Sequence, residues 1–297
     1  MPPGSILYMD GGDDTFYTLA YFLFAWRLRP DVEPHDRGGL VFPNPYGSDF
    51  RSLTKEHKEA RRREIEAASV LERPTFYSTL AESILPVFKL VQTGLLRRIV
   101  SGPGGTEDRA LWEVYPLRAL SALGRAHYRY RALVPVYAVM RATSDREQGR
   151  LSEALTRLRG ALDSGGDVLW IPGAVSREGQ WIGYAASSRG DWLMAEQAYA
   201  LAAQASPREA GIWLNLGVSL EKQGRRAEAE AAHRRGLGVA SGPAEAAQAY
   251  YNLGALCWAA EDWRRASEMF SEAARLSPDG AKAASLARQA AGRAGAP

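Results

Sequence analysis

The sequence has little of what metal and redox sites require. Among 297 residues it has one cysteine, Cys257, and four histidines. A single cysteine excludes an internal disulfide and a multi-cysteine metal site. The histidines form no pair with metal-ligand spacing; they are His35, His57, His127 and His233. We therefore predict no metal centre and no bound cofactor.

The sequence also lacks a hydrophobic run long enough to cross a membrane. The longest one, Phe16 to Trp26, has eleven almost unbroken apolar residues, whereas a transmembrane helix needs about 20. The amino end carries no positive charge, and no small-residue cleavage site follows the run, so a signal peptide is not indicated either. The chain as given is expected to be soluble.

Neither sign of charge is in clear excess. The formal net charge is +3, because 37 basic side chains are opposed by 34 acidic ones spread along the chain. A nucleic-acid-binding surface needs a concentrated basic patch that releases counterions from phosphates. Nucleic acid is therefore not an expected partner.

Familiar catalytic motifs are missing as well. The segment "GPGGTED" lacks the G-K-[ST] end of a phosphate-binding loop, and no G-x-S-x-G nucleophile elbow occurs. In "MDGGDD", Gly12 stands where the D-x-D pattern of haloacid-type phosphatases has its second aspartate. No residue is therefore predicted to be catalytic.

What the sequence does contain is a repeat in its carboxy-terminal half. In three copies a glycine is followed after 12 residues by an alanine: Gly183 and Ala195, Gly217 and Ala229, Gly254 and Ala266. The glycines are 34 and then 37 residues apart. With Trp213 and Leu216 before the second glycine, and Phe270 and Pro278 after the third, the pattern resembles the tetratricopeptide repeat.

That resemblance implies helix pairs that stack into a right-handed superhelix with a concave wall. We predict repeats over about 177–210, 211–247 and 248–281, within a helical region 126–297. A fainter copy is predicted to be a degenerate capping repeat, because the segment after it is too long for the period; it contains Gly149, Ala154, Leu158 and Ala161. A generic helical bundle would not keep the 12-residue step three times.

The first helix of each repeat lines the concave wall of such a superhelix. By this register the wall consists of Gln180, Tyr184, Ser187, Leu214, Val218, Glu221, Tyr251 and Ala255. These side chains are mixed and partly apolar, and we predict that they bind a protein or peptide partner. The alternative is that the superhelix only packs against other parts of the protein.

The first hundred residues have the pattern of a small α/β layer. Four runs predict strands: "SILYMD", "RGGLVF", "PTFYST" and "GLLRRIV". Between them, Thr15 to Leu28 and Thr54 to Ala68 predict helices. The predicted fold class is therefore α/β plus all-α, with a small α/β domain over 1–100, a linker and connecting helix over 101–125, and a tetratricopeptide-like α-solenoid after them.

The turn after the first strand has two possible roles. Its glycines allow positive φ, and Asp13, Asp14 or Thr15 can cap the helix that follows. Alternatively, Asp10, Asp13 and Asp14 bind a metal or a sugar, since the carboxyl end of a first strand is a common site position in α/β domains. We favour the structural role.

A second resemblance covers the whole chain. The runs "ILYMDGGDDTFYTLAYFLFAWRLRPDV", "RGGLVFPNPYGSDF", "RPTFYST" and "LPVFKLVQTGLLRRIV" resemble the soluble segment after the membrane spans of polytopic proteins related to protein O-mannosyltransferases. Members of that family typically have a G-D-N-D-T-F-P-like turn, an R-x-D-V motif and tetratricopeptide-like helices at the carboxyl end. In this turn Tyr17 stands where proline is usual.

The second resemblance implies a membrane glycosyltransferase-like parent whose catalytic acids lie outside this chain. The chain would then be its extracytoplasmic, periplasmic domain, non-catalytic by itself, contacting a protein partner or acceptor and the membrane part of the parent. The alternative function is a stand-alone α/β enzyme, or a sugar- or metal-binding protein, that uses Asp10, Asp13 and Asp14.

Overall fold

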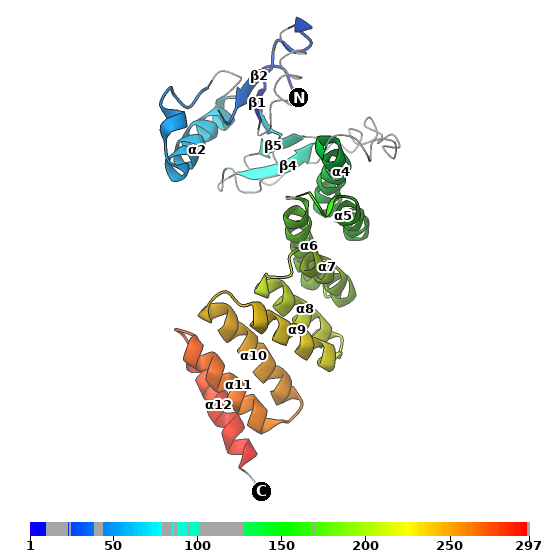
Figure 1. The fold of residues 1–297 in the computed structure, drawn as a ribbon, viewed down its shortest axis with the longest axis vertical. Helices are drawn as coiled ribbons and strands as arrows, with labels where there is room; N and C mark the ends of the chain where they lie inside the picture. The colour runs from blue at the N-terminus through cyan, green and yellow to red at the C-terminus, as the bar shows by residue number, and fades with distance from the viewer. Residues whose placement is uncertain are drawn as a thin grey trace. The chain divides into compact units, whose positions relative to one another are not determined.

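The computed structural model divides the chain into two units, Met1–Ala119 and Leu120–Pro297 (Figure 1). The residues that it describes are 1–9, 23, 25–38, 44–78, 85, 88–93, 96–100, 128–168 and 170–295. Asp10, Asp13 and Asp14 of the acidic turn lie outside these residues, as do most of the predicted first helix and the predicted linker.

The first unit contains a five-stranded sheet of order β2-β1-β3-β5-β4. Its strands are β1 Ile6–Met9, β2 Glu33–Asp36, β3 Thr75–Tyr77, β4 Lys89–Thr93 and β5 Leu96–Val100. β1 pairs in parallel with β2 and β3, whereas β5 pairs antiparallel with β3 and β4. All four residues of β1 are buried, as its unbroken apolar sequence and central position require.

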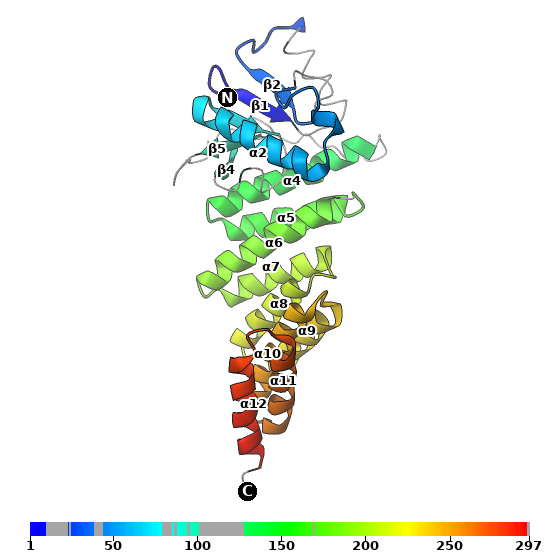
Figure 2. The same cartoon turned by 90° about the vertical axis from the view of Figure 1, so that its left-hand side faces the viewer.

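The helix α2, Lys55–Glu72, covers one face of this sheet (Figure 2). Its partly buried Ile65 and Val70 pack against the cluster that includes Ile6 and Tyr8 of β1. Thr54 caps the amino end of the helix, since its side chain accepts a hydrogen bond from the backbone N–H of His57. The short 3-10 helix η2, Phe50–Ser52, precedes it. The helix predicted from Thr54 to Ala68 is thus confirmed and ends later.

The sheet differs from the sequence-based prediction at two strands. The pattern predicts a strand in "RGGLVF", but β2 ends at Asp36, and Arg37 and Gly38 lie in a turn; the rest of that run lies outside the described residues. β2 has the sequence "EPHD", which does not suggest a strand. Among the described strands it pairs with β1 alone, and an edge strand tolerates a proline such as Pro34. β4 was not predicted, and it forms a hairpin with β5.

The second unit is a stack of helices that follow one another in sequence order (Figure 1). They are α4 Tyr128–Glu147, α5 Leu151–Gly165, α6 Ile171–Ser188, α7 Trp192–Ala205, α8 Ala210–Lys222, α9 Arg226–Val239, α10 Pro243–Ala259, α11 Trp263–Leu276 and α12 Ala281–Ala294. We call α4, α6, α8 and α10 the A helices, and α5, α7, α9 and α11 the B helices. Each A helix packs chiefly against the B helix that follows it.

A glycine beneath a ring forms the crossing of three of these pairs. The ring lies 16 residues after the glycine: Tyr199 after Gly183, His233 after Gly217 and Phe270 after Gly254. A Cβ added at the three glycines would come within 2.7, 2.4 and 2.8 Å of the respective rings. Ala142 and Leu158, both fully buried, occupy the equivalent positions of the α4–α5 pair. The close approach explains why the repeat keeps a small residue here.

The turn between the helices of a pair is repeated too. Seven residues after the small residue, φ is positive in all four pairs: 78° at Gly149, 76° at Gly190, 78° at Gly224 and 60° at Glu261. The α4–α5 pair therefore shares the backbone register of the others, although its sequence match is faint. The residues that lengthen the interval before the next pair extend the amino end of α6.

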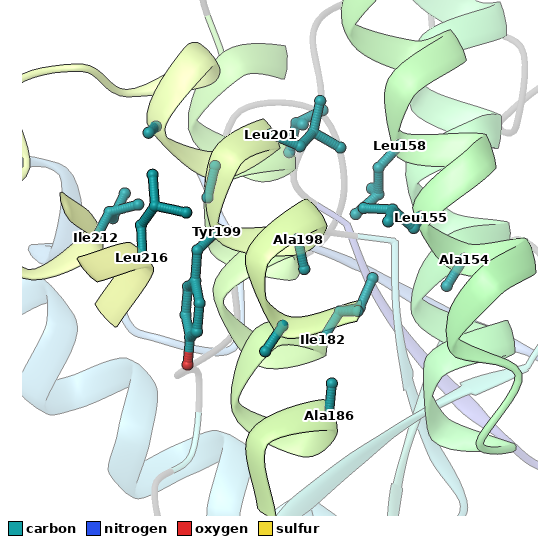
Figure 3. Packing of buried hydrophobic residues seen from close by; sticks show 14 of the residues in the cluster. Ala154, Leu155, Leu158, Ile182, Ala186, Ala198, Tyr199, Leu201, Ile212 and Leu216 are labelled. Atoms are coloured by element: carbon teal, nitrogen blue, oxygen red, sulfur yellow. The ribbon is translucent and has the colours of Figure 1, made fainter. Parts of the chain in front are cut away.

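Buried apolar side chains join the pairs from α4 to α9 and Leu256 of α10 into one cluster, and α10, α11 and α12 share a second cluster. Figure 3 shows Leu158 of α5 facing Leu201 of α7, and Tyr199 of α7 lying beside Ile212 and Leu216 of α8. No pair buries its apolar surface alone, so each one depends on its neighbours.

The helix α12 covers the last pair. The Arg293 guanidinium lies over the rings of Trp258 and Trp263, 4.8 and 4.7 Å from their centroids. The Ser267 hydroxyl of α11 donates to the Ala287 carbonyl at 3.0 Å. These contacts fix α12 against both helices of the α10–α11 pair.

Candidate functional site

Three A helices present a repeated stripe of exposed or half-buried residues. On α6 it consists of Arg177, Trp181, Tyr184 and Ser188; on α8 of Gly211, Asn215, Val218 and Lys222; on α10 of Gln248, Asn252, Ala255 and Ala259. In each helix these positions are spaced by four, three and four residues, so they lie on one face. We call this set the A-helix stripe.

The eight residues predicted for the concave wall divide into three groups. Tyr184, Val218 and Ala255 belong to the A-helix stripe. Half-buried positions beside it hold Gln180, Ser187, Glu221 and Tyr251. Leu214 is 6% exposed and packs toward Gly236 of α9, so it contributes to the core between α8 and α9. A binding role for all eight residues stays a prediction.

Three of the half-buried residues already have partners within the protein. The Ser187 hydroxyl donates to the Tyr184 carbonyl at 3.0 Å. The Gln180 side-chain amide donates to the Glu209 carboxylate at 3.2 Å. The Tyr251 ring meets Phe270 edge-on with a centroid separation of 5.5 Å, and the Lys282 ammonium lies 5.4 Å from its centroid. Tyr251 thus helps to hold α12 against α10.

Sequence reasoning missed the row of the stripe that stands two residues before each glycine. This row consists of Trp181, Asn215 and Asn252. Trp181 is 48% exposed and meets the 65% exposed Tyr184 edge-on, with centroids 6.4 Å apart. The common offset from the glycines was the available signal, but the row was not recognised.

The two asparagines of this row keep hydrogen-bonding groups available. Among the described residues, the Asn215 side chain has no hydrogen-bond partner, and it is exposed. Asn252 Oδ1 accepts from Gln248 Nε2 at 2.8 Å, which leaves the Asn252 N–H donors for another acceptor.

Charge separates the A helix from the B helix in the α8–α9 and α10–α11 pairs. α8 contains two charged residues and α10 one, whereas α9 and α11 contain five each. Many B-helix charges form surface ion pairs, as between Arg265 and Glu230 at 2.6 Å and between Arg275 and Glu272 at 2.8 Å. The A-helix stripe is therefore mainly aromatic, amide and small, with Arg177 and Lys222 as its charged residues, while α9 and α11 present a charged surface to solvent.

The first unit contains a buried polar cluster around Glu66, which the sequence pattern did not indicate. Its carboxylate accepts hydrogen bonds from the Tyr46 and Tyr77 hydroxyls, both at 2.7 Å, and from Arg37 Nε at 2.9 Å. Burial, reinforced by the Glu66 charge, raises the pKa of both tyrosines. Burial likewise raises the pKa of Tyr8 to about 12. The cluster ties α2 to the sheet and is satisfied by these internal partners, which is a structural role.

Two further properties bear on possible sites. Within the part of the chain that the structure describes, no group of three or more histidine, cysteine or acidic residues could hold a metal ion. Over the same residues, no helix is both long enough and apolar enough to cross a membrane. The ligand role of Asp10, Asp13 and Asp14 stays a prediction, because these residues lie outside the described ranges.

Comparison with known proteins supports the repeat architecture. Residues 208–279, which include α8 to α11, match the sequence profile of the family described as tetratricopeptide repeat. The solenoid type predicted from the glycine and alanine spacing is thereby confirmed for this region. No curated protein matches the chain.

Several solved structures are similar to the chain at low identity. The first TPR of Spaghetti (RPAP3), bound to the HSP90 peptide SRMEEVD, is 16% identical, with 41% of this chain and 94% of that one covered and a TM-score of 0.38. The MamA protein is 15% identical, with 54% of this chain and 84% of that one covered and a TM-score of 0.41. BtubC (BKLC) from P. vanneervenii is 18% identical, with 59% of this chain and 83% of that one covered and a TM-score of 0.37. The relationship to O-mannosyltransferase-related proteins is not shown by these findings.

Proposed function

We propose that the second unit binds a peptide or protein segment on the A-helix stripe. The observation that carries this proposal is a pair of exposed aromatic side chains, Trp181 and Tyr184, on one helix face of a stacked-repeat fold. Exposed aromatic residues side by side are typical of interaction surfaces. Stacked repeats also present a continuous surface along successive helices, which suits an elongated ligand.

The expected contribution of the two rings follows from their exposed area. A tryptophan or tyrosine buries about 150–250 Å², and Trp181 is still 48% and Tyr184 65% exposed here. Covering both would remove on the order of 200 Å² from water, worth roughly 5 kcal/mol before the entropic cost of association. Truncating both rings should therefore raise the Kd by more than about tenfold.

A finer part of the proposal concerns the protein to which this chain belongs. We infer that it serves as the extracytoplasmic domain of a membrane glycosyltransferase-like protein and that the A-helix stripe contacts a partner or acceptor of that protein. Support comes from the sequence resemblance in the first unit, together with the absence of catalytic motifs from the sequence. The chain alone is then expected to transfer no sugar.

A bead-displayed library of random dodecapeptides tests the binding function. Peptides selected on the wild-type protein are measured against Trp181→Ala/Tyr184→Ala and against Leu193→Ala. Leu193 is 57% exposed on the B helix α7, so its truncation is a matched control. We expect the double variant to lose affinity and Leu193→Ala to keep it. Equal affinity for all three proteins, or no selected peptide, would refute the proposal.

The second candidate function is a sugar or metal site at Asp10, Asp13 and Asp14. In its favour, β1, β2 and β3 are parallel, so their carboxyl ends meet at one edge of the sheet, where Asp36 is also buried. The test incubates the purified chain with lipid-linked and nucleotide-activated sugars and acceptor peptides. Sugar transfer by the chain alone would establish this candidate if Asp10→Asn or Asp13→Asn abolished it. We expect no transfer.

A further inference from the structure

We propose that the α10–α11 pair has a binding site for a basic amphipathic helix, that α12 occupies this site within the same chain, and that a partner helix of the same chemistry replaces α12 there. The site consists of four aromatic side chains of α10 and α11, which we call the aromatic row: Tyr251, Phe270, Trp258 and Trp263. The inference concerns a surface other than the A-helix stripe and does not depend on the proposed function.

Each ring of the aromatic row meets the next one edge-on. The ring centroids of Tyr251 and Phe270 are 5.5 Å apart, and those of Phe270 and Trp258 are 6.3 Å apart. Trp258 and Trp263 stand nearly perpendicular, with 85° between their planes and 5.2 Å between their centroids. Two tryptophan rings at this angle present their faces to one point between them, where a cation can contact both.

Two cations of α12 already lie on the aromatic row. The Lys282 ammonium is 5.4 Å from the Tyr251 centroid, and the Arg293 guanidinium lies over both tryptophans. Aromatic side chains that surround a cation in this way are a known means of recognising organic cations. Arg293 also stands in the last turn of α12, where the helix dipole favours a positive charge. The row therefore has the geometry of a cation site, and the chain supplies the first occupant.

The repeat itself does not require the two tryptophans. Trp258 and Trp263 stand four and nine residues after Gly254. At the same distances after Gly217, the α8–α9 pair has Glu221 and Arg226. The tryptophan pair is therefore a particular feature of the pair that α12 covers.

The contacts that hold α12 in place are ones that another helix can reproduce. The residues that α12 buries are alanines, which bring one methyl group each: Ala283, Ala287 and Ala290. Its three charged residues are all basic, and none of them forms an ion pair among the described residues. The hydrogen bond from Ser267 goes to a backbone carbonyl, a group that every helix offers. A helix with a small-residue face and an arginine can therefore compete with α12.

A labelled peptide that copies α12 tests the inference. The probe is fluorescein-labelled "AKAASLARQAAGRAG", residues 281–295, and fluorescence anisotropy measures its Kd for the full chain. Arg293→Met removes the cation and keeps an unbranched side chain over the rings. Arg288→Met is the matched control, because Arg288 is exposed on the same helix and has no partner among the described residues. We expect Arg293→Met to lower the Kd of the peptide by roughly tenfold, since its own α12 competes less well, and Arg288→Met to leave the Kd at the wild-type value.

Two further measurements separate the role of the cation from effects on the fold. The same peptide carrying Arg293→Met should bind roughly tenfold more weakly than the original peptide. Hydrogen exchange of the α12 amides should be about tenfold faster in the Arg293→Met protein than in the Arg288→Met protein, with α8 unchanged. Equal Kd values for the two variant proteins, no measurable binding, or equal affinity of the two peptides would overturn the inference. Equal exchange rates of α12 in the two variants would overturn it as well, because Arg293 would then not hold this helix in place.

Discussion

Replacing His233 with phenylalanine should stabilise the second unit and remove a pH dependence from it. His233 is fully buried in the α8–α9 crossing, against Gly217. Neither of its ring nitrogens has a hydrogen-bond partner among the described residues. Burial lowers the pKa of His233 from its usual 6.5 to about 4. The folded protein therefore holds this imidazole neutral at all but strongly acidic pH.

The sign of the effect on stability follows from proton binding. Between pH 6.5 and 4 the unfolded chain binds a proton at His233 that the folded chain does not. The free energy of unfolding therefore falls as the pH is lowered through this window. Each pKa unit corresponds to about 1.4 kcal/mol, so the loss reaches roughly 2 kcal/mol at pH 5 and about 3 kcal/mol below pH 4.

Phenylalanine is a suitable replacement because Phe270 occupies the equivalent place over Gly254. It removes the two unpartnered nitrogens, which should add about 1–3 kcal/mol at neutral pH. Urea denaturation followed by circular dichroism, at neutral pH and near pH 5, measures both effects. His233→Leu serves as a second non-titrating variant, since Leu158 fills this position in the first pair. A wild-type protein that loses no more stability on acidification than the two variants would refute the reasoning.

Three further experiments test other features of the fold. Ala266→Leu should lower the free energy of unfolding by about 1–3 kcal/mol, because Ala266 is fully buried. Arg264 has an 89% exposed side chain, so Arg264→Lys should not move the thermal midpoint. Equal midpoints for the two variants would contradict the repeat register. The Cys257 thiol, whose pKa is raised by burial, should react with thiol reagents only after unfolding, and rapid labelling of the native protein would place it outside the core. Glu261→Gly should stabilise the protein by up to about 1 kcal/mol, because glycine adopts the positive φ of this position without strain. Glu268→Gly within α11 should destabilise the protein by about as much. The opposite order of stabilities would show that Glu261 does not have a positive φ.

The repeats could be predicted from sequence because their determinants are local and recur. A glycine and the ring 16 residues later belong to one helix pair, so Gly217 and Gly254 reveal the crossing without any knowledge of the rest of the chain. The same register contains the row of Trp181, Asn215 and Asn252, which could therefore have been found. The burial of Leu214 depends on the absence of a side chain at Gly236 of the facing helix, and an A-helix pattern alone does not show that.

The first unit could be predicted only in outline, because its determinants are non-local. The strand order β2-β1-β3-β5-β4 brings together segments that are far apart in sequence. Glu66 is tolerated in the core because Arg37, Tyr46 and Tyr77 donate to it from positions 29, 20 and 11 residues away. On α2 itself, Glu66 is one of several glutamates, and its own helix gives no sign that it is buried. Pro34 similarly becomes compatible with a strand only because β2 lies at the sheet edge.

Site-specific photo-crosslinking tests the central claim, that the A-helix stripe is the binding surface, most directly. Benzoylphenylalanine is introduced at position 184 on the stripe or at position 264 on the charged B helix α11, and each protein is irradiated with a peptide selected from the dodecapeptide library. We expect a covalent adduct from position 184 and none from position 264. Adduct formation from position 264 alone, or with equal yield from both positions, would contradict the claim that the stripe is the binding surface.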